Sequence, residues 1–190
     1  KLDELIENTN LILKRPTIDF YSIPTTSGTG SEVTSFATVW DMKLKKKLSI
    51  SHPYLYPDFA IVDPELTFDL PDVQTLSTAF DALNQSFESF WNQNRNILTT
   101  YLAANSISKA IKGLNIFSVD KKSNLMRINL AESSLLSGLA ISQTRTSICH
   151  SISYPLTAHY GLEHGFACAF SMREVITMIL EKDPSILHEL

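Results

Sequence analysis

Glycine, cysteine and long apolar runs are scarce in this sequence, and each scarcity excludes a class of protein. The 190 residues include 6 glycines and 2 cysteines. Cys149 and Cys168 belong to no CxxC pair and suggest no disulfide framework, which favours a reducing, cytoplasmic setting. No apolar run approaches the roughly 18 to 20 residues that a membrane span needs, and the charged, polar start shows no signal peptide. We expect a cytoplasmic protein with no membrane partner.

Positive charge is also in short supply. Lys and Arg number 16 against 20 Asp and Glu, so the formal net charge is −4 at pH 7. This balance argues against a nucleic-acid partner. The one basic run, residues 43–47, is short and typical of a solvated turn. Hydrophobic residues at 44% and charged residues at 19% are ordinary for a globular protein, and the length suffices for one sizeable core or two modest domains.

The local sequence pattern changes near residue 70, from strands and turns to helices. After an opening helix over residues 1–15, short β-type runs occupy residues 18–23, 36–40, 47–50 and 59–62. Apolar spacings of three and four then indicate helices at residues 77–91, 97–112, 125–141, 146–158 and 165–181. Pro155 should kink or end the fourth of these. The strands are too few for a complete nucleotide-binding sheet, so we expect part of that domain upstream of Lys1.

Two polar segments in the helical part carry potential metal ligands. Asp81 and Gln85 are four apart, so they share one face of a helix, and both offer oxygen atoms. A helix carrying His150, a break at Pro155 and a returning loop can bring His164 to the same point. Imidazoles with a carboxylate suit Zn(II) or Fe(II). Each feature alone has a more common explanation, as a solvated polar pair or as a hydrogen-bonded structural histidine.

A third polar segment is the loop PTTSGTGSEVT, residues 24–34. Gly28 and Gly30 free its backbone, and its threonines and serines supply hydroxyl groups that can face a phosphate or a ribose. It lacks the GK[ST] ending of a Walker A loop, and Val33 stands where a GxGxxG motif needs its last glycine. A polar turn without a ligand is the alternative.

Taken together, the three segments resemble the iron-containing (group III) alcohol dehydrogenases. PTTSGTGSEVT resembles their signature loop, and PDFAIVDPELTFDLP resembles the link into their helical domain. DALNQSFES resembles the first metal helix, usually DAL-x-H-x-x-E, and HSISYPLTAHYGLEHG resembles the second metal segment. The resemblance covers essentially the whole chain. It implies an α/β plus all-α fold, in which residues 1–70 complete a dinucleotide-binding α/β domain and residues 71–190 form a helical metal-binding domain, incomplete at its C-terminus.

The resemblance also implies an activity, cofactors and site residues. The activity is hydride transfer between NAD(H) or NADP(H) and a short aldehyde or alcohol, with Fe(II) or Zn(II) as a Lewis acid. The implied metal ligands are Asp81, Gln85, His150 and His164, and the implied cofactor contacts are Thr25, Thr26, Thr29, Thr34 and Lys47. The full-length protein is expected to be a homodimer. The family's glycine-rich pyrophosphate loop is absent and should precede Lys1.

Two positions depart from the family pattern. The family usually has histidine at position 85, and the amide oxygen of Gln85 is a harder and weaker donor than imidazole. Binding through Asp81, His150 and His164 alone, with Gln85 nearby, is therefore the alternative. Tyr154 stands where many relatives carry a histidine close to the substrate, and we take it as a candidate catalytic proton donor.

The stretches SEVTSFATVWD, ESFWNQN and QTRTSICHSISYPLTAHYG most resemble the phosphonoacetaldehyde reductase branch, which forms 2-hydroxyethylphosphonate. Arg145, five residues before His150, can hold a phosphonate with two parallel hydrogen bonds and is the second candidate catalytic residue. A structural role, capping a helix or pairing with Glu132, is the alternative, and another short aldehyde is an equal candidate substrate.

Two rival interpretations of the whole chain stay open. It is a degenerate, non-catalytic metal-binding relative, or it is a fragment that is inactive in isolation.

Overall fold

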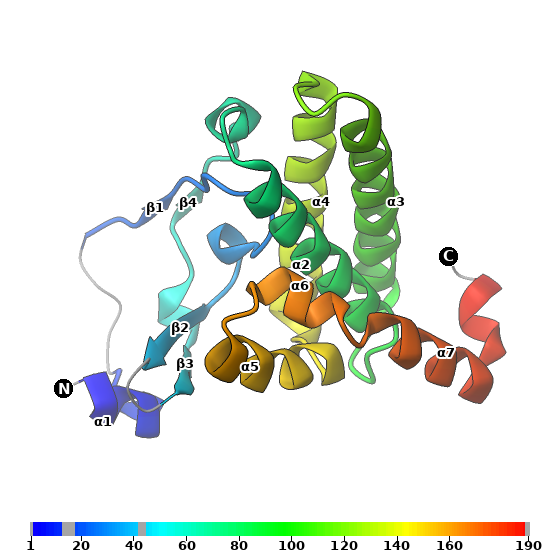
Figure 1. The fold of residues 1–190 in the computed structure, drawn as a ribbon. Helices are drawn as coiled ribbons and strands as arrows, with labels where there is room; N and C mark the ends of the chain where they lie inside the picture. Colours follow the sequence, from blue (N-terminus) through cyan, green and yellow to red (C-terminus); the bar gives the residue numbers. More distant parts are fainter. Residues whose placement is uncertain (1, 13–17, 42–44, 189–190) are drawn as a thin grey trace.

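Helices make up most of the chain after residue 71 and pack as a bundle. The computed structural model describes residues 2–12, 18–41 and 45–188. Helices α2 (Asp72–Phe90), α3 (Ile97–Val119) and α4 (Asn124–Thr144) lie side by side (Figure 1). Helices α5 (Ile148–Tyr160) and α6 (His164–Ala169) pack on each other and on α2, and α7 (Met172–Lys182) leads to the short helix η5 (Pro184–His188).

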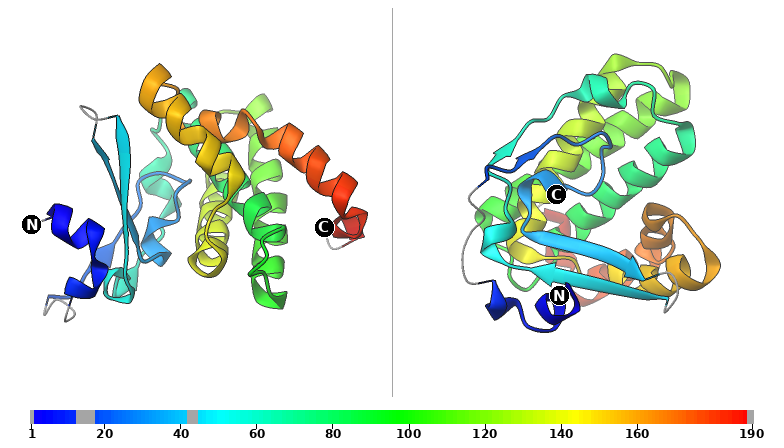
Figure 2. Two further views of the ribbon diagram at one scale, coloured as in Figure 1. Left: turned by 90° about the horizontal axis from the view of Figure 1, so that it is seen from below. Right: turned by 90° about the vertical axis from the view of Figure 1, so that its left-hand side faces the viewer.

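The strands precede the bundle and flank it on one side (Figure 2). After α1 (Leu2–Glu7) and η1 (Thr9–Leu11), strand β1 (Tyr21–Ser22) pairs in parallel with β4 (Phe59–Ala60). Strands β2 (Phe36–Asp41) and β3 (Lys46–Ser51) form an antiparallel hairpin. Single 3-10 turns complete this part: η2 (Ser31–Val33), η3 (Pro53–Leu55) and η4 (Pro64–Thr67).

Helix α2 is buried on almost every side because neighbours cover both its apolar and its polar faces. Ala79 joins an apolar cluster with residues of α3 and α4, and Leu83 joins a second cluster with α3. Small side chains allow close helix contacts, since the hydroxyl of Ser86 donates to Ser106 at 2.7 Å, and that of Ser106 to the carbonyl of Ser133 at 2.7 Å. The remaining face of α2 carries Asp81 and Glu88, whose carboxylates contact His150 of α5.

The structure corrects the bounds of three predicted elements and one of the two effects expected of Pro155. The opening helix ends at Glu7, and the first predicted strand is reduced to Tyr21–Ser22, while residues 13–17 lie outside the described part. The predicted helix 165–181 is two helices, because α6 packs along α2 while α7 turns away to cover an apolar cluster around Phe90. Pro155 does not end its helix, since α5 continues to Tyr160 and stops at Gly161, whose φ is +68°.

Candidate metal centre

Three side chains from three helices converge on one point. His150 Nε2 of α5 lies 3.3 Å from Asp81 Oδ1 of α2, and His164 Nε2 of α6 lies 4.0 Å from the same oxygen. The two imidazole rings have their centroids 5.5 Å apart. Asp81 and His150 are buried, whereas His164 is partly exposed. The structure therefore brings together three of the four predicted ligands through their donor atoms.

Glu88, fully buried on α2, fixes the orientation of His150. Glu88 Oε2 lies 2.6 Å from His150 Nδ1 and accepts a backbone N–H from Ser147 at 2.8 Å. Glu88 Oε1 accepts backbone N–H groups from Cys149 at 2.5 Å and from His150 at 3.3 Å. These N–H groups belong to the first turn of α5, where a negative charge is favourable. An ionised carboxylate only accepts hydrogen bonds, so Nδ1 carries the proton that is donated to Glu88. Nε2 is then directed at Asp81. In many metal-binding histidines a carboxylate orients the ring in the same way, through the nitrogen that does not bind the metal.

The acids and the imidazole of this cluster shift one another's pKa values. Burial alone would raise the pKa of Asp81 and of Glu88, but hydrogen bonds and charge from His150 outweigh it and hold both pKa values below normal. Burial would lower the pKa of His150, but bonds to Asp81, Cys168 and Glu88 raise it well above its usual value. A cation is thus stabilised between two carboxylates, and a divalent metal would displace the proton on the imidazole.

Cys168 is a site residue that the sequence reasoning missed. It is fully buried on α6, and its Sγ lies 3.8 Å from His164 Nε2. Donor atoms of Asp81, His150, His164 and Cys168 all lie within 4.8 Å of one another. Burial would raise the pKa of the thiol, but hydrogen bonds with His150 and His164 outweigh it and lower that pKa. The available signal was the spacing of four between His164 and Cys168, which places both on one helix face.

Gln85 lies beside this cluster, one turn after Asp81, and its amide is hydrogen-bonded. The hydroxyl of Ser137 on α4 donates to Gln85 Oε1 at 3.0 Å. Its role as a fourth ligand stays a prediction.

A cleft of about 500 Å³ opens at the cluster. Its lining combines the four predicted ligands with side chains of the threonine loop, the hairpin, α4 and the turn between α4 and α5: Asp81, Gln85, His150 and His164, then Thr29, Ser31, Thr34, Phe36, Ala37, Thr38, Lys47, Ile141 and Thr146. Three of the predicted cofactor contacts, Thr29, Thr34 and Lys47, therefore share a cleft with the predicted ligands. Thr25 and Thr26 belong to the same loop but not to this lining.

Glycine contacts hold the threonine loop against the helices. Gly30 has a φ of +60°, and a Cβ there would lie 2.3 Å from the Cα of Gly138 on α4. A Cβ on Gly28 would lie 2.7 Å from the Cβ of Thr78 on α2. Only glycine permits both approaches, and the left-handed backbone at Gly30 also favours it. The loop thus lies directly on the two helices that carry Asp81 and the support for Gln85.

Tyr154, predicted as a proton donor, lies next to the ligands. Its ring is nearly parallel to that of His164, with an interplanar angle of 13° and centroids 6.5 Å apart. Lys47 Nζ lies 3.8 Å from the centre of the Tyr154 ring. Tyr154 therefore links His164 to the hairpin.

Arg145 lies at the rim of the cleft and occupies the C-cap position of α4, with a φ of +64°. Its exposed guanidinium donates to Ser51 Oγ at 3.3 Å and lies 5.4 Å from the ring of Phe36, a cleft residue. Glu132, the alternative partner considered from sequence, pairs with Lys109 of α3.

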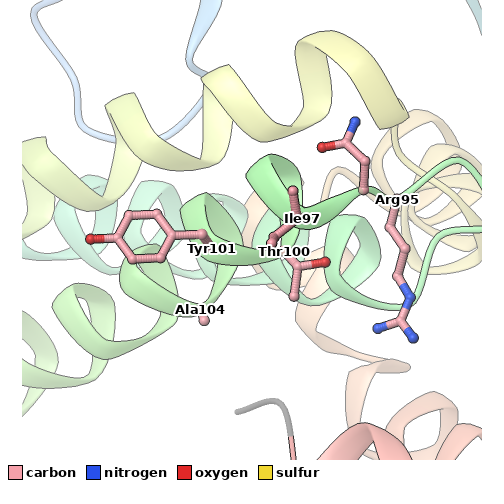
Figure 3. A pocket seen from close by; sticks show the side chains of 6 residues that line it. Arg95, Ile97, Thr100, Tyr101 and Ala104 are labelled. Atoms are coloured by element: carbon pink, nitrogen blue, oxygen red, sulfur yellow. The ribbon is translucent and has the colours of Figure 1, made fainter.

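A second hollow lies at the start of α3 and shares no lining residue with the cleft (Figure 3). Its lining residues are Arg95, Asn96, Ile97, Thr100, Tyr101 and Ala104. The side chain of Asn96 caps α3 by accepting the N–H of Thr99, and Arg95 donates to the carbonyl of Phe90 at 3.2 Å. The lining contains no histidine, cysteine or carboxylate, so these side chains stabilise the turn and we assign them no chemistry.

The residues of the cluster fit a divalent metal, because a buried carboxylate, two imidazoles and a thiol meet where a cleft gives access. Such a donor set is typical of zinc and non-haem iron sites. Residues 75–190 match the model of the Fe-containing alcohol dehydrogenase family, C-terminal, and residues 2–64 match that of iron-containing alcohol dehydrogenase. The chain belongs to the iron-containing alcohol dehydrogenase family, and the predicted α/β plus all-α fold class is confirmed.

Individual relatives agree with this assignment. The phosphonoacetaldehyde reductase of Streptomyces viridochromogenes is 35% identical over 85% of this chain and 41% of its own length. A 1-propanol dehydrogenase of Citrobacter freundii is 35% identical over 82% of this chain and 42% of its own. The crystal structure of sulfoacetaldehyde reductase from Bifidobacterium kashiwanohense in complex with NAD+ superimposes with a TM-score of 0.82 at 34% identity, over 87% of this chain and 44% of that one.

The chain thus spans about two fifths of the length of these relatives. Across residues 2–12, 18–41 and 45–188, none of the helices combines the length and the hydropathy that crossing a bilayer requires.

Proposed function

We propose that the protein containing this chain is a metal-dependent alcohol dehydrogenase that interconverts a short aldehyde and its primary alcohol with NAD(H) or NADP(H). The observation that carries the proposal is the convergence of Asp81, His150 and His164 at a cleft walled by the threonine loop. Family membership supports the same activity.

Asp81, His150 and His164 would hold Fe(II) or Zn(II), and Glu88 would keep His150 Nε2 directed at it. When bound, the metal supplies Lewis-acid polarisation of a carbonyl oxygen, and the nicotinamide supplies the hydride. Thr29 and Thr34 line the same cleft and would orient the cofactor beside the substrate. We assign Thr25, Thr26 and Lys47 to cofactor binding too, since they come from the same loop and the adjoining strand.

Tyr154 is proposed as a proton donor to the product oxygen. Its ring lies beside His164, and Lys47 Nζ lies over its face at 3.8 Å.

In the domain arrangement that we propose, residues 1–70 complete the dinucleotide-binding domain and residues 71–190 belong to the helical domain. The start of the helical bundle at Asp72 supports that boundary. We also propose a homodimer for the whole protein, since α3 exposes large apolar side chains such as Ile97 and Val119 at 92% and 90%. Light scattering of the full-length protein tests that assembly.

A substrate panel tests the activity. The full-length protein is loaded with Fe(II) or Zn(II) and assayed with both nicotinamide cofactors and a series of short aldehydes. Metal-dependent oxidation of NADH or NADPH is the expected result, and Asp81→Asn should abolish it. Stoichiometric metal without turnover of any aldehyde would instead make the protein a non-catalytic metal-binding relative.

For the substrate, we propose phosphonoacetaldehyde, with Arg145 as the residue that holds the phosphonate. Relatives of nearly equal identity are named for a phosphonate, a sulfonate and uncharged 1-propanol, so identity alone does not choose among them. The position of Arg145 supports an anionic substrate, because its guanidinium lies over the cleft residue Phe36 and Thr146 lines the cleft. A guanidinium binds a tetrahedral oxyanion with paired hydrogen bonds.

Arg145→Ala tests this choice of substrate. The loss of one partner of a charge-assisted pair costs about 2 to 5 kcal/mol, and the exposure of Arg145 favours the lower end, or roughly 30-fold in kcat/KM. That loss is expected with phosphonoacetaldehyde and not with propanal, and the exposed Arg173→Ala on α7 should leave both unchanged. Equal losses for the two aldehydes would make Arg145 structural. A wild-type enzyme without preference for phosphonoacetaldehyde would refute the proposed substrate.

A further inference from the structure

Cys168 lies on the interior side of the metal cluster. Its side chain is fully buried, and its Sγ lies 3.8 Å from His164 Nε2 and within 4.8 Å of the donor atoms of Asp81 and His150. Asp81, His150 and His164 line the cleft, whereas Cys168 does not. A sulfur at this position would therefore reach a metal held by Asp81, His150 and His164 from the protein interior. The side of the metal that faces the cleft would stay open.

The amide oxygen of Gln85 already has a hydrogen-bond partner on α4. The hydroxyl of Ser137 donates to Gln85 Oε1 at 3.0 Å. An amide nitrogen does not serve as a metal ligand, and the oxygen that could serve is held on α4.

We propose that the Cys168 thiolate, and not the Gln85 amide, is the fourth protein ligand of this metal. The inference rests on the metal site of the proposed function and names its donor set as Asp81, His150, His164 and Cys168. As the bond from Sγ to the metal forms, the thiol proton leaves to solvent. Two anionic ligands then balance the charge of a divalent ion.

The geometry permits this set with small movements. Zinc bonds of about 2.1 Å to nitrogen or oxygen and about 2.3 Å to sulfur place tetrahedral ligand atoms about 3.6 Å apart. The distance from Cys168 Sγ to His164 Nε2 is already 3.8 Å, and the most widely separated donor atoms lie within 4.8 Å. Side-chain rotations that move the ligand atoms by about 1 Å bring these distances to the tetrahedral value.

Cobalt(II) substitution of the full-length protein tests the inference, because thiolate ligands produce a near-ultraviolet charge-transfer band that oxygen and nitrogen ligands lack. The protein is titrated with Co(II), and bound metal is measured separately by elemental analysis. We expect the band in the wild type and its loss in Cys168→Ser. It should persist in Cys149→Ser, which removes the other buried thiol, and in Gln85→Leu.

Metal preference gives a second readout. Thiolates favour Zn(II) over Mn(II), which prefers oxygen ligands. Loss of an outer-shell partner already lowers metal affinity about 10- to 100-fold, so Cys168→Ser should weaken Zn(II) binding at least about 100-fold and Mn(II) binding much less. A purely structural cysteine would weaken both metals equally, and that result would overturn the proposal.

The outcomes separate this inference from the proposed function. Stoichiometric Co(II) without the band, or a band that survives in Cys168→Ser, overturns the thiolate ligand and leaves the metal site standing. Failure of the wild type to bind metal overturns both.

Discussion

The carboxylate of Glu88 should be indispensable for metal binding although it touches no metal. Glu88→Gln keeps the size of the side chain and replaces one acceptor oxygen with an NH₂ donor. In the wild type, the two oxygens accept from His150 Nδ1 and from three backbone N–H groups at the start of α5. The amide must therefore direct its NH₂ group at groups that are themselves donors.

The least costly response is a change of tautomer in His150. If Nδ1 accepts from the new NH₂, the ring proton moves to Nε2, the atom that faces Asp81 and the metal point. At least one backbone donor still loses its partner, which costs about 1 to 3 kcal/mol. The lost charge at the N-terminus of α5 adds about 0.3 to 1 kcal/mol. We expect a total destabilisation of about 1 to 4 kcal/mol and a loss of metal affinity of about 10- to 100-fold.

Urea unfolding of the metal-free protein and a Zn(II) titration measure the two effects separately. Glu132→Gln is the matched control, because Glu132 on α4 is largely exposed and pairs only with Lys109 in the described structure, so its loss should cost less than about 1 kcal/mol. If Glu88→Gln bound Zn(II) as tightly as the wild type, the reasoning that Glu88 sets the His150 tautomer would be refuted. If Glu88→Gln were as stable as Glu132→Gln, the expected cost of the lost hydrogen bond and charge would be refuted.

Two further changes test how the site is built. Gly165→Ala should abolish metal binding, because its Cβ would lie 1.7 Å from the carbonyl oxygen of Ser77 and must push α6, with His164, away from α2. Isothermal titration with Zn(II) against the wild type measures this, and unchanged binding would contradict it. Glu32→Gln should stabilise the protein at pH 7. Burial raises the pKa of Glu32 above its ordinary 4.5, so the wild type loses stability as pH rises through that pKa and the buried carboxyl ionises. The neutral amide of Gln avoids this loss. The advantage, measured by urea unfolding, should vanish below pH 4.5, and a destabilised variant at pH 7 would contradict the sign.

The helices and three donors of the site were predictable from local patterns. Apolar spacings of three and four located the cores of α2, α3 and α4, because each helix buries a continuous stripe. Asp81, His150 and His164 followed from the resemblance of two motifs to those of a known family, and the structure brings their donor atoms together. The residues alone left each of them with a more common structural explanation.

Cys168 and Glu88 could not be assigned in the same way. A cysteine four residues after a histidine occurs on many helices. Cys168 reaches the other donor atoms only because α6 packs closely on α2, and the contact of Gly165 with Ser77 permits that packing. Glu88 stands at the last position of the DAL-x-H-x-x-E motif, but its role depends on where α5 begins. Both depend on the packing of separate helices, which a local pattern does not encode.

A crystal structure of the metal-loaded, full-length protein, with anomalous diffraction recorded at the absorption edge of the metal, tests the central claim most directly. The account predicts one strong peak about 2.0 to 2.3 Å from Asp81, His150 and His164, with Cys168 Sγ at about 2.3 Å. Gln85 should keep its amide oxygen on Ser137. A peak elsewhere in the molecule, or stoichiometric metal that leaves His150 and His164 uncoordinated, would contradict it.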